Sequence, residues 1–541
     1  MRAIRNLRYA RPILFFSLVL GGIWLSGFFL LLVTTDTVSN PVTVGKVWVD
    51  RFRATGSTPQ TGFKTTKSPR YAELCEALPH AAGELRDLDD RWGRISLEMS
   101  VAHAGSGIRM RRALRRLINQ EPFVISVIGG SITGGHGVNK TNGGEKYTDY
   151  LQRSLRKTYP NVTVLNVGIP GHGSDYFSNC YQLHSPTNAD MYIIESAVND
   201  IENAQHVKNA GETGDTIGYT ELFVRQLLSN RPDNAVMMMS SFGSGADYAN
   251  AAHLHNVVSE YYDIPRLSMR TFMYPYMLQY VDERILRYDK PDIRHPNEYG
   301  HMYMADILYR YLMREACRSA EEVELGLVPH PIEQYKPEAA QLKDENGKDL
   351  PGFDPERVSE YDKHWLPYPE VSGTSLNHAW DPFTLPSLRI NQNWVYNNKV
   401  RPEGSAFCQT TDVIADDGLP VMRPSKNDGW EHVVTKDKHY WKSDKVGAQI
   451  TFDNIDVHAG IVSLFHLRCD QNYGNAKCWI DDKKNEAVEI VSTWKFICIS
   501  TLAVVTDRAP PGKHSVTCEI SENTADKNGK HDFAIAAIIS H

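Results

Sequence analysis

Several features are scarce or missing in this sequence of 541 residues. Positive charge is not in excess, because 58 Lys and Arg residues stand against 65 Asp and Glu residues and the formal net charge is -7. This balance argues against a nucleic-acid binder that works by neutralising phosphates. The Cys and His residues show no zinc-type spacing, so we expect neither a metal nor a cofactor. The sequence also contains no internal repeat.

The remaining composition is that of an ordinary globular protein. Hydrophobic residues make up 41% and charged residues 23%, which excludes wholesale disorder and the collagen and coiled-coil classes. The eight Cys residues are too few for a small disulfide scaffold, and their meaning depends on the compartment. The length predicts two or three domains.

One long apolar run stands out at residues 12–33, which contain no charged side chain. About 20 apolar residues span a bilayer as a helix. Arginines precede the run, and the first charge after it is Asp36. The positive-inside rule therefore predicts a cytosolic tail at residues 1–11 and a single-pass type II membrane protein of the Golgi or the cell surface. The alternative is an uncleaved or late-cleaved signal sequence.

This topology places everything after residue 33 in the lumen or outside the cell. Two sequons, at Asn139 and Asn161, are then predicted glycosylation sites. The cysteines face an oxidising space and can pair, although their connectivity cannot be read from a sequence. We predict the disulfides Cys469–Cys478 and Cys498–Cys518 and, by elimination, Cys75–Cys317 and Cys180–Cys408.

Composition divides the chain that follows the apolar run. Residues 34–70 are rich in Thr, Ser, Gly and Pro and predict a flexible stalk. Residues 71–325 begin with a helical stretch and then alternate between strand and helix. Proline crowds residues 326–385, which predicts a linker. Residues 386–541 hold short alternating strands, which are typical of an antiparallel β-sandwich.

Residues 71–325 predict an α/β domain of three layers. Its strands are expected at residues 123–128, 162–167, 191–195 and 235–241, and helices at 147–159, 216–229, 249–262 and 296–314. Because the strands are short apolar runs separated by helices, they are expected to be buried on both faces. This pattern is typical of a parallel sheet with helices on each side.

The predicted β-sandwich is rich in tryptophan, with Trp430, Trp441, Trp479 and Trp494. Two interpretations stay open for these side chains. Aromatic rings on the face of a sandwich can stack on sugar rings, which would make residues 386–541 carbohydrate-binding. The rings can equally fill the core or pack between strands.

Chemistry-bearing residues gather in four blocks. The first block, residues 128–135, holds Ser131 in a glycine-rich turn directly after the first strand. The other blocks are residues 166–173, 195–200 and 292–296, and each follows a predicted strand or precedes a helix. The carboxyl ends of strands in an open parallel sheet converge on one crevice. The four blocks are therefore predicted to form a single site.

In this order, over roughly residues 121–320, the blocks resemble those of the SGNH (GDSL-type) hydrolase superfamily. The resemblance implies a three-layer hydrolase domain in which Ser131 is the nucleophile, His295 its general base and Asp292 the residue that orients the imidazole. It also implies an oxyanion hole made by the backbone N–H groups of Ser131 and Gly171 and the side-chain amide of Asn199.

Two residues depart from the pattern of this superfamily. Gly130 stands where the family often has Asp, and Ala197 stands where it often has Gly. Neither departure removes a chemical group from the catalytic residues or the oxyanion hole, but both can reshape the site.

Structural roles are alternatives for some of these residues. Asn199 or the neighbouring Asp200 can cap a helix N-terminus. Asp292 can cap the helix that starts near Pro296, because proline suits a first helical turn. In each case a capping residue would need no contact with a substrate.

The histidines near the blocks also allow more than one interpretation. His301 is a second candidate base, but it would lie inside the last helix of the domain. His136 and His172 flank the proposed site. They either contact the substrate or are solvated loop residues.

The sequence favours an esterase that acts on a glycan. We expect it to remove acyl groups, acetyl first among them, from an acylated glycan in the secretory lumen or at the cell surface. This expectation depends on the four blocks, the predicted topology and the β-sandwich, and it is an analogy at family level. The alternatives are a glycan O-acyltransferase that uses the same serine and a non-catalytic glycan-binding protein on a hydrolase fold.

Overall fold

The computed structural model describes two groups of residues within one compact unit, Ser68–His541. They are residues 79–139, 144–204, 213–231, 233–243, 248, 250–280, 294–324, 385–386, 389–390, 406–435, 438–494 and 498–541. In these ranges no helix is both long and apolar enough to cross a membrane. The predicted tail, membrane span and stalk, and nearly all of the predicted linker, lie outside the described residues. Those predictions stay predictions.

A six-stranded sheet forms the centre of the first group of described residues, with the strand order β1-β6-β5-β4-β2-β3. Its strands are β1 (Val101–His103), β2 (Phe123–Gly129), β3 (Val162–Gly168), β4 (Met191–Glu195), β5 (Ala235–Ser240) and β6 (Arg266–Ser268). Neighbouring strands from β2 to β6 pair in parallel, which confirms the predicted parallel sheet. The edge strand β1 pairs antiparallel with β6, so a short strand interrupts the stretch that was expected to be helical.

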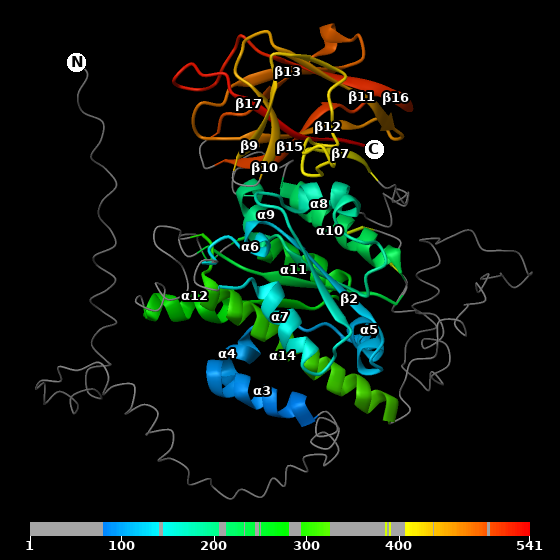
Figure 1. Ribbon diagram of the computed structural model, residues 1–541, viewed down its shortest axis with the longest axis vertical. Helices are drawn as coiled ribbons and strands as arrows, with labels where there is room; N and C mark the ends of the chain where they lie inside the picture. Colours follow the sequence, from blue (N-terminus) through cyan, green and yellow to red (C-terminus); the bar gives the residue numbers. More distant parts are fainter. Residues whose placement is uncertain are drawn as a thin grey trace, which may run out of the picture. The chain divides into compact units, whose positions relative to one another are not determined.

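Helices connect and cover these strands (Figure 1). They are α3 (Pro79–Trp92), α4 (Arg94–Met99), α5 (Ile108–Ile118), α6 (Ser131–Gly134), α7 (Tyr147–Arg156), α8 (Ser174–Cys180), α9 (Ala197–Ala204), α10 (Thr213–Asn230), α11 (Ala252–Tyr261), α12 (Arg270–Gln279) and α14 (Glu298–Glu324). A crossover helix is the usual connection between parallel strands. The alternation therefore follows from the parallel pairing.

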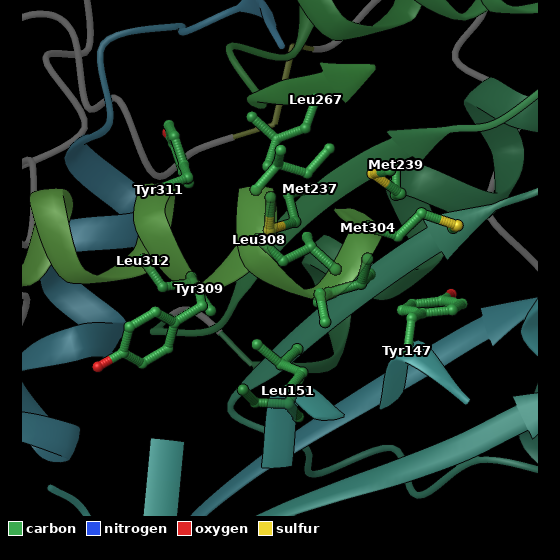
Figure 2. Close-up of a cluster of buried hydrophobic side chains, with 14 of the residues drawn as sticks. Tyr147, Leu151, Met237, Met239, Leu267, Met304, Leu308, Tyr309, Tyr311 and Leu312 are labelled. Carbon is green, nitrogen blue, oxygen red and sulfur yellow. The ribbon is translucent and has the colours of Figure 1, made fainter. Parts of the chain in front are cut away.

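Alternate side chains of the central strands β2, β4 and β5 enter two different hydrophobic clusters. Met237 and Met239 of β5 pack in one cluster with α5, α7 and α14. Val236 and Met238, on the opposite face, pack in the other with α8, α10 and α11. Figure 2 shows the first cluster, where side chains of α14 such as Leu308 meet the two methionines. Because successive strand residues point to opposite faces, both faces of the sheet are buried between helices.

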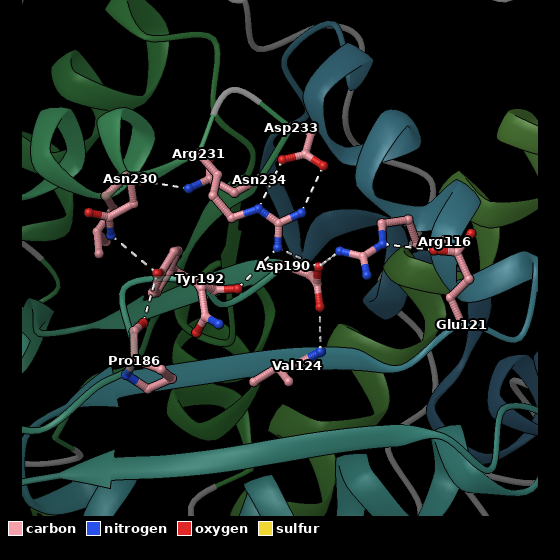
Figure 3. Close-up of polar contacts among 12 residues, drawn as sticks. Arg116, Glu121, Val124, Pro186, Asp190, Tyr192, Asn230, Arg231, Asp233 and Asn234 are labelled. Atoms are coloured by element: carbon pink, nitrogen blue, oxygen red, sulfur yellow. Dashed lines mark hydrogen bonds and ion pairs between the residues drawn. The ribbon is translucent and has the colours of Figure 1, made fainter.

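Asp190, directly before β4, is the centre of a hydrogen-bond network at the amino end of the sheet (Figure 3). Its carboxylate accepts hydrogen bonds from the Val124 backbone N–H at 2.7 Å, from Arg231 at 2.9 Å and from Arg116. Arg116 lies in α5 and Arg231 follows α10. A buried charge is tolerated when it is paired and hydrogen-bonded in this way. This network lies at the opposite end of β4 from the predicted catalytic blocks.

Two antiparallel sheets make up the second group of described residues, with strand orders β15-β12-β17-β10-β9 and β14-β13-β16-β11-β8; β7 pairs with β17. The strands are β7 (Phe407–Thr410), β8 (Lys426–Asp428), β9 (Glu431–Thr435), β10 (Lys438–Ser443), β11 (Gln449–Val457), β12 (Val462–Arg468), β13 (Asn475–Ile480), β14 (Val488–Val491), β15 (Ile499–Thr506), β16 (Gly512–Ile520) and β17 (Phe533–Ser540). Side chains from both sheets share one hydrophobic cluster.

The four tryptophans of these sheets are buried. Trp430 and Trp441 are 4% and 8% exposed and belong to the shared cluster. Trp479 and Trp494 are 6% and 9% exposed and pack under Lys484 and Arg468. These positions favour the packing interpretation over stacking on sugars.

The disulfides of the antiparallel sheets correct the predicted pairing. Cys469 bonds to Cys498 and Cys478 bonds to Cys518, so the predicted pairs Cys469–Cys478 and Cys498–Cys518 were wrong. The reason is strand register rather than nearness in sequence. Cys478 and Cys518 stand opposite each other on β13 and β16. Cys469 and Cys498 flank the paired ends of β12 and β15, whereas β12 and β13 belong to different sheets.

The other two predicted disulfides have different outcomes. Cys180, the last residue of α8, bonds to Cys408 of β7, which confirms the pair inferred by elimination. Cys317 is buried and disulfide-bonded, but its predicted partner Cys75 lies outside the described residues. The Cys180–Cys408 bond therefore joins the α/β part to the antiparallel sheets.

Replacement of Cys180 and Cys408 by Ser is expected to lower the free energy of unfolding by about 2 to 5 kcal/mol. The bond closes a sequence separation of 228 residues, against 40 for Cys478–Cys518. Chain entropy therefore predicts that removal of the second pair costs roughly 1.5 kcal/mol less. Urea unfolding of the two double variants measures this difference. An equal or larger loss for the Cys478–Cys518 pair would contradict the prediction.

Candidate active site

Ser131 and His295 meet at the carboxyl edge of the parallel sheet. Ser131 opens α6 directly after β2, and its Oγ lies 2.8 Å from His295 Nε2. Both side chains are half-buried, so a substrate can reach them. In the tautomer with an unprotonated Nε2, the Ser131 hydroxyl donates this hydrogen bond. That geometry allows the imidazole to accept the hydroxyl proton as a nucleophile forms.

Close packing of a glycine holds His295 in place. Gly137 has a φ of +87°, and a Cβ at this position would lie 2.4 Å from the Pro296 carbonyl oxygen and 2.9 Å from His295 Cβ. Only glycine adopts this backbone conformation at such a distance without strain. The ring of His136 stands edge-on to that of His295, with 5.3 Å between centroids. The structure thus places His136 beside the base, where its predicted substrate contact stays a prediction.

The proposed third residue, Asp292, lies outside the described residues. Its orienting role and the alternative role as a helix cap therefore both stay predictions. Residues 294–297, which follow it, lead into α14.

The environment of His301 is that of a packed structural residue and not that of a general base. It is fully buried in α14, its Nδ1 accepts the Tyr147 backbone N–H at 3.2 Å, and its ring stacks on that of Tyr147. Burial lowers the pKa of His301 to about 4. The imidazole is therefore neutral at ordinary pH, and its Nδ1 is already occupied.

Asn199 lies directly against the nucleophile turn. A Cβ on Gly130 would lie 2.0 Å from Asn199 Oδ1 and 3.0 Å from Asn199 Nδ2. Since α9 begins at Ala197, neither Asn199 nor Asp200 is its N-cap, so that alternative was wrong. This arrangement also explains one departure from the superfamily pattern: the space that a side chain on residue 130 would need is filled by the Asn199 amide.

Asp200 fixes the segments that carry the predicted oxyanion donors. Its buried carboxylate accepts hydrogen bonds from the Ser174 backbone N–H and hydroxyl, both at 2.7 Å, and from the Ser196 hydroxyl at 2.9 Å. His255 Nε2 of α11 lies 2.8 Å away. The carboxylate therefore ties the starts of α8 and α9 to α11. The sequence signal for this role was an Asp beside Asn199, which we considered only as a helix cap.

Glu195 supports α6, the short helix that begins at Ser131. It ends β4, is 1% exposed, and accepts hydrogen bonds from Thr133 Oγ1 at 3.0 Å and from the Ser241 hydroxyl. Thr133 lies in α6 two residues after Ser131 and also contacts the Tyr147 hydroxyl at 2.8 Å. Burial raises the pKa of Glu195 to about 7. A charged residue that ends an apolar strand was the signal for this role, which sequence reasoning missed.

His172 does not face a substrate in the structure. It is fully buried, its Nδ1 lies 3.1 Å from the Pro170 carbonyl oxygen and its Nε2 lies 2.9 Å from Asp412 Oδ2. Burial alone would raise the pKa of Asp412, but His172 and the Thr410 hydroxyl hold it below its ordinary value. His172 therefore connects residues 169–173, the loop between β3 and α8, to the antiparallel part. Its predicted substrate contact would require the contact with Asp412 to open.

The two predicted glycosylation sites differ in their exposure. Asn161 is exposed, and its Nδ2 donates to the Gln120 carbonyl oxygen at 2.8 Å. Asn139 is half-buried, and part of its sequon lies outside the described residues. Glycosylation at both positions stays a prediction.

Residues 127–303 match the GDSL-like Lipase/Acylhydrolase family. The matched segment contains Ser131, Gly171, Asn199 and His295, and the match supports the resemblance to the SGNH hydrolase superfamily inferred from the four blocks. It supports a hydrolase of the acylhydrolase type. No curated protein matches the chain.

Two solved structures share the fold over most of the chain. Both are of a two-domain esterase active on acetylated mannans, and one was co-crystallised with mannopentaose. At 18% identity, one covers 82% of this chain and 98% of its own with a TM-score of 0.52. The mannopentaose complex covers 82% and 97% with a TM-score of 0.51 and the same identity. The likeness shows a common fold that extends over both the α/β part and the antiparallel sheets.

The buried carboxyl of Glu195 predicts a specific pH dependence of stability. Since its pKa rises from 4.5 to about 7 in the folded chain, folding favours the protonated form, and this contribution is lost as the pH rises through that window. Glu195→Gln imitates the protonated form. Between pH 5 and pH 8 the variant is expected to gain about 2 to 3 kcal/mol in free energy of unfolding relative to wild type.

Urea unfolding of both proteins across this pH range measures the gain. The same substitution at the exposed Glu486 is the control for removal of a charge alone. A difference between wild type and Glu195→Gln that stays constant with pH would show that the Glu195 carboxyl does not titrate in this window.

Proposed function

We propose that the chain is a serine esterase that removes acyl groups, acetyl first among them, from a glycan. The observation that carries this proposal is the 2.8 Å contact between Ser131 Oγ and His295 Nε2 at the carboxyl edge of the sheet. The Asn199 amide lies beside the same turn. A nucleophile, a base and a candidate oxyanion donor thus stand together, as acyl transfer requires. The activity of the structural neighbour on acetylated mannans supports an acetylated glycan as the substrate class.

The reaction follows from this geometry in two halves. Ser131 Oγ attacks the ester carbonyl carbon while His295 Nε2 takes the hydroxyl proton. The carbonyl oxygen becomes an oxyanion, which the Ser131 and Gly171 backbone N–H groups and the Asn199 amide are proposed to bind. His295 then gives its proton to the leaving sugar hydroxyl, and an acyl-serine remains. A water molecule, deprotonated by His295, attacks the acyl-serine, which releases the carboxylic acid and restores Ser131.

The acceptor in the second half decides between hydrolysis and transfer. A sugar hydroxyl in place of water would make the same acyl-serine the intermediate of an O-acyltransferase. Analysis of products in the presence of an acceptor glycan separates the two reactions. A non-catalytic glycan-binding protein would need no contact between Ser131 and His295, so their contact favours an enzyme.

The proposed location is the secretory lumen or the cell surface, with residues 12–33 as the anchor of a type II protein. Three disulfides among the described residues, Cys180–Cys408, Cys469–Cys498 and Cys478–Cys518, support an oxidising compartment, because such bonds are rare in reducing ones. Localisation of a tagged full-length chain, with protease protection of each terminus, tests this proposal. A C-terminus exposed to the cytosol would reject it.

Ser131→Ala is expected to lower the release of acetate from p-nitrophenyl acetate and from an acetylated mannan by roughly 10³-fold or more. The substitution removes the nucleophile but keeps the fold, which thermal unfolding of the variant checks. Wild-type protein treated with a fluorophosphonate should carry the adduct on Ser131. Hydrolysis by Ser131→Ala at the wild-type rate, or an adduct on another residue, would reject Ser131 as the nucleophile.

Asn199→Ala is expected to lower kcat for p-nitrophenyl acetate by about 10²- to 10³-fold, since it removes one oxyanion donor. Gly130→Ala should cause a loss of the same kind, because its Cβ would lie 2.0 Å from Asn199 Oδ1 and must displace the amide. The two losses are therefore expected to be non-additive in the double variant. Gly134→Ala, at the end of the short helix that Gly130 precedes, is the matched control, because its Cβ would meet no atom closer than 3.5 Å. Fully additive losses would contradict this account.

A further inference from the structure

A lysine from the antiparallel sheets reaches the predicted oxyanion hole. Lys438 is the first residue of β10, and its Nζ lies 2.5 Å from the position that a Cβ on Gly171 would occupy. Its Cε lies 3.4 Å from the same point. Gly171 has a φ of +80°, so this residue provides a left-handed turn and also leaves room for the ammonium group. A side chain at position 171 would require the end of Lys438 to shift.

The surrounding contacts hold Lys438 over the 169–173 loop. His172, next to Gly171, pairs with Asp412 at 2.9 Å. Thr411, next to Asp412, donates its hydroxyl to the carbonyl oxygen of His439, which follows Lys438 in β10. The two residues that meet, Gly171 and Lys438, are thus joined through their immediate neighbours.

Two further contacts join the antiparallel sheets to the segment that follows Gly171. Cys180 of α8 is bonded to Cys408 of β7, and the Tyr176 hydroxyl donates to Thr410 Oγ1 at 3.0 Å. The antiparallel sheets are therefore anchored to the helix that follows the 169–173 loop. A cation carried by β10 keeps a defined position relative to Gly171.

Other lysines of these sheets are placed differently. Lys442 of β10 pairs with Asp532 at 2.8 Å, and Lys484 pairs with Glu519 at 2.6 Å. Both partners belong to the antiparallel part. The ammonium of Lys438 lies next to Gly171, in a loop of the α/β part. This difference makes Lys442 a matched comparison, because it is a lysine of the same strand in a different role.

We infer that Lys438 acts at the oxyanion hole of the esterase site, as a catalytic residue supplied by the antiparallel part. Its ammonium places a positive charge next to Gly171, whose backbone N–H is proposed to bind the carbonyl oxygen of the ester. A fixed charge at this place stabilises the transition state more than the neutral ground state. This inference rests on the proposed function, and it deepens that function by making the C-terminal sheets part of the catalytic centre.

The test compares Lys438→Met and Lys438→Arg with wild type on p-nitrophenyl acetate, a small neutral ester. Met keeps much of the aliphatic stem but removes the charge, so kcat is expected to fall about 10- to 100-fold with KM changed by less than about 2-fold. Arg keeps the charge and should restore a large part of kcat. Lys442→Met is the control and should retain wild-type kcat.

Three outcomes of this comparison would overturn the inference. One is a wild-type kcat for Lys438→Met on the small ester. Another is a loss confined to KM for acetylated mannan, which would make Lys438 a residue that binds the glycan. A loss of kcat that Arg does not restore, together with lowered thermal stability, would assign a structural role and also reject the inference.

A labelling experiment separates failure of this inference from failure of the proposed function. Fluorophosphonate attack by Ser131 also places negative charge in the oxyanion hole, so Lys438→Met should label more slowly than wild type and by a factor similar to its loss of kcat. Equal labelling rates would reject the role of Lys438 while leaving the serine esterase intact. No label on wild-type Ser131 would reject the esterase itself, and the inference with it.

Discussion

The buried carboxylate of Asp200 is the contact on which the geometry of the site depends. It accepts hydrogen bonds from Ser174 and Ser196 and meets the His255 ring at 2.8 Å. Each partner comes from a different helix or its leading turn, so one charge sets the relative positions of α8, α9 and α11. A charge this deeply buried is stable only while its hydrogen bonds are kept. The position of Asn199, one residue earlier in α9, is therefore set by a network that never touches the ester.

Asp175 is a second buried acid close to Asp200, and its pKa shows how the two carboxyls affect each other. Burial, together with the negative charge of Asp200, raises the pKa of Asp175 to about 7. Two close carboxyls in a dry environment do not both ionise readily. Asp200 accepts hydrogen bonds from the side chains of Ser174 and Ser196, whereas the donors to Asp175 are backbone N–H groups, among them that of Tyr176 at 2.9 Å.

The sequence was sufficient to predict the parts of the site that depend on strand order. Parallel strands bring their carboxyl ends together, so Ser131, Asn199 and His295 could be predicted as neighbours. It was insufficient to predict side-chain contacts and disulfides that depend on packing between segments distant in the sequence. Cys478 and Cys518 pair through the register of β13 and β16, and His172 is buried because Asp412, 240 residues away, meets it. The spacing of residues in the sequence predicts neither the register of these strands nor the contact between His172 and Asp412.

The contacts in the structure also change the interpretation of the antiparallel sheets. An appended binding module would be expected to present its aromatic rings to solvent and to contact the enzyme little. Here the tryptophans are buried, and several contacts with the α/β part fall on the segment from Gly171 to Cys180. That segment begins with a predicted oxyanion donor and ends with a disulfide. Because the sheets contact both ends of it, the shape of the proposed oxyanion hole depends on the antiparallel sheets as well as on the parallel sheet that carries Ser131.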